Sequence, residues 1–222
     1  RGRVDELVAD PDVAEKLKPY YKMFCKRPTF NDEFLPTFNR PNVELIDTDG
    51  KGVEKITEKG VIVAGVEYEL DCLIYGTGFE VGTSYTRRSG YEVYGRDDLT
   101  LSEHWKEGTR TLHGMGSFGF PNLFIMNTSQ GGFTANFPHL LDETAIHQAH
   151  IIAYALDAGH TKVEVTQAAE DAWVETILDF KGGPLGGLGG PDCTPGYYNN
   201  EGQPNPTALQ SAPYGGGSIR FF

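Results

Sequence analysis

The sequence predicts an α/β chain that combines a small antiparallel meander, two helices and a long Gly/Pro-rich tail. Segments between residues 53 and 70 alternate apolar and polar residues, which is the period of half-buried strands. Two later segments, at about 138–156 and 168–180, repeat apolar residues at roughly helical spacing. Residues 181–222 contain 11 glycines and 6 prolines in 42 positions, so long regular elements are not expected there.

The N-terminal part is expected to begin with a helix. Asp10 is a suitable N-cap and Pro11 suits the first helical position, which predicts a helix over residues 11–22. A turn-rich segment follows over residues 27–41. Val43–Ile46 is then predicted to be a short strand.

The meander is predicted from three alternating segments with turns at Lys59-Gly60 and at Gly65: Val53–Ile56, Val61–Ala64 and Val66–Leu70. Leu73–Tyr75 is predicted to be a buried strand that closes it. That strand ends in Gly76-Thr77-Gly78, where glycine allows a sharp turn or a close approach to a ligand. Taken alone, this pattern favours an ordinary core strand followed by a tight turn.

The second half of the chain is predicted to contain a helical turn at Leu101–Trp105 and an apolar strand at Leu123–Met126. A long helix is expected from about Pro138 to Leu156, with Gly159 beyond its end. The helix at about Ala168–Phe180 places Trp173, Ile177 and Phe180 on one face. In the tail, five aromatic residues in a Gly/Pro background favour a segment wrapped over a surface, although a disordered tail is the alternative.

Charge and hydropathy exclude several classes of partner. The net charge is -12, and it is uneven: residues 1–40 hold 8 basic and 7 acidic side chains, while the remainder hold 11 and 24. Such an acidic body argues against duplex nucleic acid, which requires a basic surface. No apolar run approaches the roughly 20 residues of a membrane-spanning helix, and no secretory signal opens the chain, so no membrane partner is expected.

The cysteines and histidines do not predict a metal site. Three widely separated cysteines form neither a zinc-binding spacing nor a disulfide framework, which fits a reducing, cytoplasmic location. Cys25 precedes two cations that lower a thiol pKa, but an inert thiol is the favoured interpretation. His147 and His150 share a helix face, and no third ligand is evident.

Two further motifs were weighed. Gly114 to Gly119 matches G-x-G-x-x-G, but Phe120-Pro121 and a strand follow it where a dinucleotide site requires a helix, so the match is interpreted as false. In Lys26-Arg27-Pro28, extended backbone would point the two cations to opposite sides, one toward a phosphate and one into a separate cavity. A solvated basic pair is the equally supported alternative.

Several segments, in this order and spacing, resemble the flavin-dependent Baeyer–Villiger monooxygenases of the cyclohexanone and phenylacetone type: Lys26-Arg27-Pro28, the run from Glu33 to Val43, the Gly76-Thr77-Gly78-Phe79 run, and Gly119-Phe120-Pro121-Asn122-Leu123-Phe124. The tail from Cys193 to Phe222 is similar to the large-ring, cyclopentadecanone-type members. The resemblance implies the C-terminal portion of a two-domain FAD/NAD(P)-binding, Rossmann-like flavoprotein. It divides into a helical segment (1–22), the end of the NADP domain (23–78), the second part of the FAD domain (79–180) and a wrapping tail (181–222).

The resemblance also implies roles for individual residues. Arg27 matches the catalytic arginine that contacts the flavin peroxide, and Lys26 matches a lysine that contacts the NADPH 2′-phosphate. Tyr197 stands where many relatives have a tryptophan that bonds the nicotinamide cofactor. The other matched positions are cofactor-binding Gly76, Thr77, Gly78, Asn136 and Pro138, and substrate-lining Phe133, Thr134 and Ala135.

The activity implied is insertion of one oxygen atom of O₂ next to a ketone carbonyl, with FAD and NADPH as cofactors and a flavin C4a-peroxide as oxidant. The nucleotide-binding turns of the family are expected upstream of Arg1, in a missing N-terminal region of the same enzyme. Two alternatives remain: a related monooxygenase that oxidises nitrogen or sulfur, and a non-catalytic binding domain that is complete as it stands.

Overall fold

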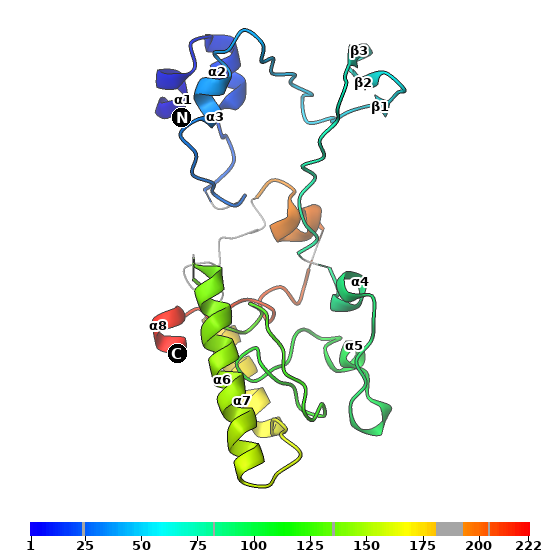
Figure 1. Cartoon of the computed structure of the whole chain (residues 1–222), viewed down its shortest axis with the longest axis vertical. Coiled ribbons are helices and arrows are strands. Elements are labelled where there is room, and N and C mark those ends of the chain that lie inside the picture. The colour runs from blue at the N-terminus through cyan, green and yellow to red at the C-terminus, as the bar shows by residue number, and fades with distance from the viewer. Residues whose placement is uncertain (24, 82, 135, 181–192, 204) are drawn as a thin grey trace. The chain divides into compact units, whose positions relative to one another are not determined.

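The computed structural model describes residues 1–23, 25–81, 83–134, 136–180, 193–203 and 205–222. The chain divides into two compact units (Figure 1). The first unit consists of Arg1–Met23 and Arg27–Phe79, and the second of Phe24–Lys26 and Glu80–Phe222.

Three short helices open the first unit: α1 (Gly2–Leu7), α2 (Pro11–Leu17) and α3 (Phe34–Thr37). The predicted cap of α2 is confirmed, because the Asp10 carboxylate accepts hydrogen bonds from the backbone N–H groups of Asp12 and Val13. The helix ends at Leu17 and not at residue 22 as predicted. Pro19 explains the difference, since proline disfavours helical backbone in the residue before it.

The helices of the first unit share a small apolar core. Val4, Val8 and Ala14 are buried in it, and Leu35 of α3 packs against them. The Asn39 side chain fixes the chain after α3 to the end of α1: its amide donates to the Leu7 carbonyl at 2.7 Å and its oxygen accepts from the Ala9 N–H at 2.8 Å. The segment after the predicted catalytic arginine is therefore held on the helices that precede it.

The predicted meander is confirmed as an antiparallel sheet of order β1-β2-β3, formed by β1 (Lys55–Ile56), β2 (Gly60–Val63) and β3 (Val66–Glu69). Val61 and Val63 are buried, while Ile62 between them is only half-buried, as the alternation predicts. Gly60 pairs with Glu69, and a Cβ at this position would lie only 1.8 Å from the Tyr68 carbonyl oxygen. Only glycine fits the strand there.

Three other strand predictions are wrong within the described residues. Val43–Ile46, Leu73–Tyr75 and Leu123–Met126 have irregular backbone. Leu73–Tyr75 was expected to be buried, yet Ile74 is 87% exposed. A strand forms only when a neighbouring strand completes its hydrogen bonds, and the described sheet contains no neighbour for these segments.

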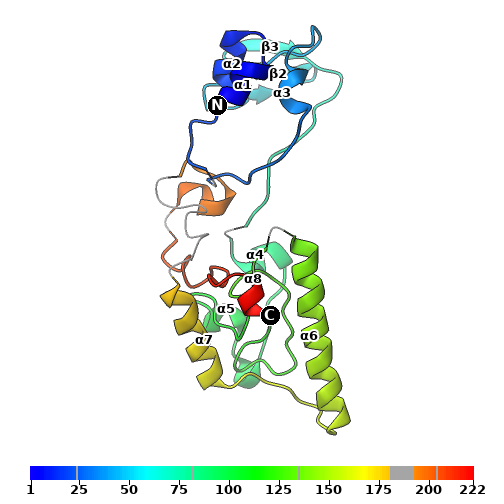
Figure 2. The ribbon, with the colours of Figure 1, turned by 90° about the vertical axis from the view of Figure 1, so that its left-hand side faces the viewer.

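Helices dominate the regular structure of the second unit: α4 (Tyr85–Ser89), η1 (Arg96–Asp98), α5 (Leu101–His104), α6 (Phe137–Asp157) and α7 (Gln167–Asp179). The predicted helices at 101–105, 138–156 and 168–180 are confirmed to within a residue or two. Figure 2 shows α6 and α7 on either side of an irregular segment that runs from Trp105 to Thr134. Leu140 of α6 and Ile177 of α7 are almost completely buried.

The C-terminal segment carries η3 (Tyr197–Gly202) and α8 (Ser218–Phe221). Tyr214 is buried, and its ring stacks on Trp173 of α7 with 5.2 Å between centroids. Its backbone N–H donates to the Gly131 carbonyl at 2.8 Å. The aromatic residue thus fixes this part of the tail on the second unit; the segment 181–192 lies outside the described residues.

A disulfide joins Cys25 to Cys193, 168 positions apart in the sequence. The expectation that Cys25 is an inert thiol, and that the cysteines form no disulfide, is therefore wrong. Spacing along the chain could not reveal the pair, because the fold brings the two Cα atoms to 5.2 Å. Cys72 is a free, exposed thiol.

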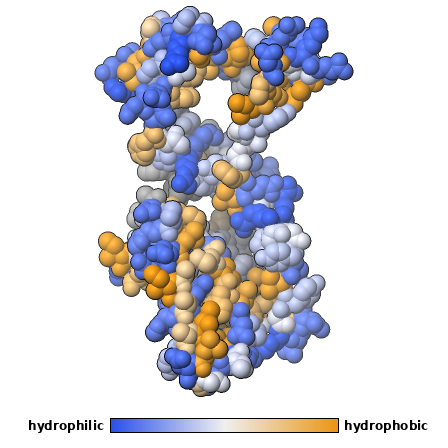
Figure 3. All heavy atoms as spheres, viewed as in Figure 1, coloured by the Kyte–Doolittle hydropathy of each residue, from blue (hydrophilic) through white to orange (hydrophobic). Residues whose placement is uncertain are grey.

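The surface carries both polar and apolar side chains (Figure 3). On α6, Ile146, Ile152 and Leu156 are exposed among polar neighbours, and in the first unit Phe79 is 80% exposed. Among the described residues, no helix has the length and apolar character required to cross a membrane.

Candidate functional site

The loop that enters α6 carries most of the predicted substrate and flavin positions. Phe133 and Thr134 are half-buried, and Asn136 is the N-cap of α6. The Asn136 side-chain oxygen accepts a hydrogen bond from the His139 N–H at 3.3 Å, and exposed Pro138 occupies the first turn. Ala135, the remaining predicted position, lies outside the described residues. These residues lie at the start of a 21-residue helix with no acidic side chain in its first turn.

The Gln130 side chain holds this loop in place. Gln130 is completely buried, and its amide nitrogen donates to the carbonyls of Thr109 at 2.6 Å and Gln210 at 2.9 Å. Its amide oxygen accepts from both the backbone N–H and the hydroxyl of Thr111. The Gln130 carbonyl accepts from the Trp173 indole at 2.9 Å. One side chain therefore connects the loop to the 109–111 segment and to the tail.

Aromatic rings pack behind the same loop. Gly132 is buried, and a Cβ there would lie 3.0 Å from the Phe221 ring and 3.1 Å from Leu140, so glycine permits close packing against α6 and α8. The Trp173 ring contacts His113 edge-on at 4.5 Å between centroids. The loop is thus supported by α6, α7 and the tail together.

A cavity of about 400 Å³ lies next to this cluster. Its lining is mostly apolar and comes from the segment 112–124, from α6, from the segment 163–166 and from the start of α7. His113 and His147 are its histidines. The pKa of His113 is lowered, first because burial disfavours the imidazolium and second because of the nearby His147 charge.

The lowered pKa of His113 predicts acid sensitivity. The unfolded chain takes up a proton near the ordinary pKa of 6.5, whereas the folded protein resists it, so stability should fall as the pH drops from 6.5 through the lower folded-state pKa. His113→Asn should reduce this fall, because asparagine is neutral and tolerates the φ of 55°. Thermal unfolding at pH 7.5 and 5.5 measures it. The exposed control His150→Gln should keep the wild-type pH dependence; equal pH dependence in all three proteins would contradict the prediction.

The segments that carry Lys26 and Tyr197, the predicted NADPH contacts, touch each other in the second unit. The Lys26 ammonium group donates to the carbonyl of Pro195 at 3.1 Å, two residues before Tyr197. The Tyr197 ring packs on Tyr198 at 4.5 Å between centroids. The disulfide joins the residues that lie directly before Lys26 and shortly before Tyr197.

Arg27 and the Gly76-Thr77-Gly78 segment belong to the first unit, and all four residues are exposed. Gly78 has a φ of 87°, which favours glycine, whereas Gly76 has open space where a Cβ would lie. The tight turn expected at these residues is not present, because the backbone from 76 to 78 is irregular without a turn or bend.

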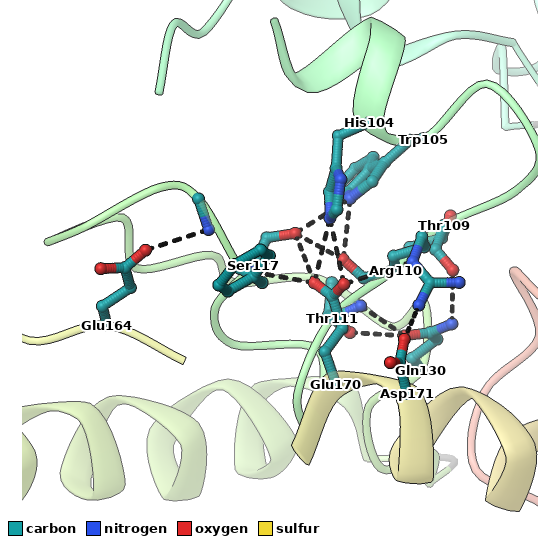
Figure 4. Close-up of polar contacts among 12 residues, drawn as sticks. His104, Trp105, Thr109, Arg110, Thr111, Ser117, Gln130, Glu164, Glu170 and Asp171 are labelled. Atoms are coloured by element: carbon teal, nitrogen blue, oxygen red, sulfur yellow. Dashed lines mark hydrogen bonds and ion pairs between the residues drawn. The ribbon is translucent and has the colours of Figure 1, made fainter. Parts of the chain in front are cut away.

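A buried polar cluster around Glu170 was not anticipated from the sequence (Figure 4). The Glu170 carboxylate, on the first turn of α7, is completely buried. It accepts from His104 at 3.0 Å, from Arg110 at 3.2 Å, from the Ser117 hydroxyl at 2.9 Å and from the Phe118 N–H at 2.8 Å. Arg110 also pairs with Asp171. Acidic residues are common in the first turns of helices, so the burial of this one could not be predicted from its position.

Hydrogen bonds keep Glu170 ionised despite its burial. Burial raises the pKa of a carboxyl group, but the bonds from His104, the Phe118 N–H and Ser117 outweigh it, so the pKa of Glu170 lies below 4.5. The cluster ties α5, the 110–118 segment and α7 together. Its contacts are all internal, which indicates a structural role.

Gly114 to Gly119 lies in an irregular segment and opens no helix, so its interpretation as a false dinucleotide motif is confirmed. In the described parts of the chain, no group of three histidine, cysteine or acidic side chains is arranged to hold a metal ion.

No protein-family model matches the chain. Individual known proteins match it over all or nearly all of its length. Pentalenolactone D synthase of Streptomyces exfoliatus is 49% identical over 223 residues, which cover 100% of this chain and 38% of that protein. A Baeyer–Villiger monooxygenase of Streptomyces coelicolor is 46% identical over 217 residues, which cover 97% and 36%.

Solved structures similar to this chain are also monooxygenases. The polycyclic ketone monooxygenase of the thermophilic fungus Thermothelomyces thermophila matches with a TM-score of 0.88 and 40% identity, over 99% of this chain and 36% of that one. A steroid monooxygenase bound to NADP matches with a TM-score of 0.71 and 32% identity, over 80% and 34%. These matches confirm the resemblance that the sequence motifs indicated. The chain spans little more than a third of the length of these relatives.

Proposed function

We propose that this chain forms the C-terminal portion of a Baeyer–Villiger monooxygenase. The premise is that it is homologous over its whole length to a part of such enzymes. The enzyme would convert a ketone, O₂, NADPH and a proton into an ester or lactone, NADP⁺ and water. The observation that carries the proposal is the 99% coverage and 0.88 TM-score against a polycyclic ketone monooxygenase. The regions that bind the cofactor pyrophosphates are assigned to the missing N-terminal region.

The start of α6 fits a flavin ring. A helix N-terminus carries partial positive charge, and no acidic side chain opposes it in this first turn. Asn136 and Pro138 are exposed there, and half-buried Phe133 offers an apolar surface to a ring or a ketone. When bound, FAD would supply the activation of O₂ with electrons from NADPH. We assign Phe133, Thr134 and Ala135 to the substrate side of this loop.

Lys26 and Tyr197 fit an NADP(H) molecule. A lysine ammonium group binds phosphate as a point charge, and a tyrosine combines an aromatic body with a polar tip. The two residues belong to segments that the disulfide and the Lys26–Pro195 hydrogen bond hold together. The Gly76-Thr77-Gly78 segment is assigned to the junction between the NADP and FAD domains.

Arg27 is assigned the catalytic role. Its guanidinium group stays charged at any working pH and donates several hydrogen bonds in a fixed plane. It would hold the negative charge that develops on oxygen when the ketone carbonyl is attacked, which is the kind of stabilisation that contributes most to such reactions. The catalytic assignment therefore rests on one side chain.

The substrate class is proposed to be a bulky cyclic ketone. Relatives at 40% identity or more include a polycyclic ketone monooxygenase and a ketocytochalasin monooxygenase. The half-buried Phe133 would favour an apolar ring system over a small polar ketone.

The test uses the complete protein that carries this chain, purified with FAD and supplied with NADPH and ¹⁸O₂. Cyclic ketones of increasing size, a thioether and a tertiary amine are offered, and products are identified by mass spectrometry. Ester or lactone carrying one ¹⁸O atom supports the proposal. Conversion of only the thioether or amine would favour a sulfur- or nitrogen-oxygenating enzyme. Cooperative unfolding of the isolated chain without cofactor, together with no turnover by the complete protein, would favour a stand-alone binding domain.

A further inference from the structure

The tail segment from Cys193 to Gly202 forms a compact loop around one side chain. The Asn199 amide nitrogen donates to the carbonyls of Cys193 at 3.3 Å and Thr194 at 3.2 Å. Its amide oxygen accepts from the N–H groups of Gly196 at 2.9 Å and Gly202 at 3.1 Å. Tyr197 belongs to this loop, so the contacts that anchor the loop also determine the position of Tyr197.

Two independent links anchor the loop to the segment that contains Lys26. The first is the disulfide between Cys25 and Cys193. The second is the hydrogen bond from the Lys26 ammonium group to the Pro195 carbonyl. The ammonium group also lies close to Gly196, since a Cβ at that glycine would be 3.4 Å from the Lys26 nitrogen. Both links are local to the second unit.

The two cysteine residues differ in accessibility. Cys25 is 2% exposed, whereas Cys193 is half-buried on the edge of the tail loop. A small thiolate can therefore approach Cys193 more readily than Cys25, and approach is a condition for thiol–disulfide exchange. Disulfides that form in cytosolic proteins of mesophiles are usually transient or redox-sensing and not permanent crosslinks.

We propose that the Cys25–Cys193 disulfide positions Lys26 and the Tyr197 loop for NADP(H), and that its reduction by a low-molecular-weight thiol weakens cofactor binding. The inference rests on the proposed function, because it takes Lys26 and Tyr197 as cofactor contacts. The cysteines are positioning residues: they contact neither cofactor nor substrate and act through their neighbours.

The chemistry is reversible thiol–disulfide exchange. A glutathione thiolate attacks the Cys193 sulfur, the S–S bond breaks, and Cys25 leaves as a thiolate that takes up a proton. A second glutathione thiolate attacks the mixed disulfide, which releases the Cys193 thiol and glutathione disulfide. Two thiols are oxidised and one protein disulfide is reduced, so the electrons balance, and glutathione disulfide drives the reverse reaction.

Reduction should affect cofactor binding more than the chemical step. Without the disulfide, NADPH must order the Lys26 side chain and the Tyr197 loop when it binds, and immobilising a few side chains corresponds to about a tenfold loss of affinity. We therefore expect the KM for NADPH to rise about tenfold in the reduced protein, with little change in kcat. A general loss of folding would instead lower kcat and the fraction of active enzyme.

The experiment uses the complete enzyme equilibrated in glutathione buffers of graded redox potential. Non-reducing peptide mass spectrometry measures the Cys25–Cys193 fraction, and initial rates measure KM and kcat. Cys25→Ser and Cys193→Ser should each show the reduced-state KM in every buffer. Cys72→Ser is the matched control, since Cys72 is a free thiol, and it should titrate like the wild type. Lys26→Met tests the route of the effect: its KM should be high and should respond less to redox potential than that of the wild type, since only the Tyr197 contribution remains.

The outcomes separate this inference from the proposed function. An enzyme that forms esters but contains no Cys25–Cys193 crosslink in oxidising buffer, or whose KM is the same in both states, overturns the positioning role and leaves the function intact. A protein that forms the crosslink but makes no ester in either state overturns the function, and with it this inference. A KM that follows the crosslinked fraction supports both.

Discussion

Replacing Arg27 with alanine is expected to lower kcat for ester formation by about 10²–10³-fold, the usual cost of removing one preorganised donor to a developing negative charge. The KM for NADPH should change little, because the neighbouring Lys26, and not Arg27, is assigned to the cofactor phosphate. Steady-state ester formation by the complete enzyme, measured with NADPH consumption in parallel, separates the two effects. NADPH consumption without ester formation would be the signature of the variant.

Matched variants make the Arg27 result specific. Arg27→Lys keeps a positive charge but loses the planar array of donors, so its rate should lie between wild type and Arg27→Ala. Arg3→Ala removes another exposed arginine of the same unit, ion-paired with Glu6 at 3.2 Å, and should leave kcat unchanged. Ester formation by Arg27→Ala within a few-fold of wild type would show that the catalytic assignment is wrong.

The helices could be predicted from the sequence far better than the strands, and hydrogen bonding explains why. A helix such as α6 completes its backbone hydrogen bonds within its own residues, and its caps, Asn136 here and Thr166 in α7, are local signals. The β1-β2-β3 meander is also local, because short turns join its strands. Leu73–Tyr75 and Leu123–Met126 have the apolar composition of buried strands, but a strand also requires a neighbour, and composition cannot supply one.

In the candidate site too, local features could be predicted from the sequence and long-range contacts could not. Phe133, Thr134, Asn136 and Pro138 could be proposed from the sequence because they lie close together and match a loop of the family. The residues that support them were not. Gln130 bonds to carbonyls 21 residues before it and 80 residues after it, and the cysteines pair across 168 positions. Such contacts depend on the folded path of the chain, so a single sequence without a structural template contains no periodic signal for them.

Glu170 is the support residue whose loss should be most costly. Its carboxylate is completely buried and faces two groups that carry or can carry positive charge, Arg110 and His104. Removing one partner from a buried charge cluster leaves the others desolvated and unpaired, which typically costs about 3–5 kcal/mol. Glu170→Ala is therefore expected to destabilise the protein by about that amount, and it would also leave the Ser117 hydroxyl and the Phe118 N–H without their carboxylate acceptor.

Glu170→Gln distinguishes charge from shape. Glutamine fills the same space but is neutral, and its NH₂ group would face donors that require an acceptor, so a loss of about 2 kcal/mol or more is expected. The exposed Glu103, paired with Lys106 on the same unit, supplies the control: Glu103→Gln should unfold at nearly the wild-type denaturant concentration. Urea unfolding followed by tryptophan fluorescence reports directly, because Trp105 donates to Ser117 in this cluster.

The Glu170 contribution should also depend on pH in a defined direction. Because the folded-state pKa lies below 4.5, the stabilisation is complete above pH 4.5 and is lost as the pH falls through the folded-state pKa. The gap in unfolding free energy between wild type and Glu170→Gln should therefore be full at pH 7 and should narrow below pH 4.5. A gap that stays constant down to pH 3 would mean that the carboxylate charge is not what holds α5, the 110–118 segment and α7 together. The lower stability of Glu170→Gln would then come from altered packing and hydrogen bonding, and not from the loss of the charge.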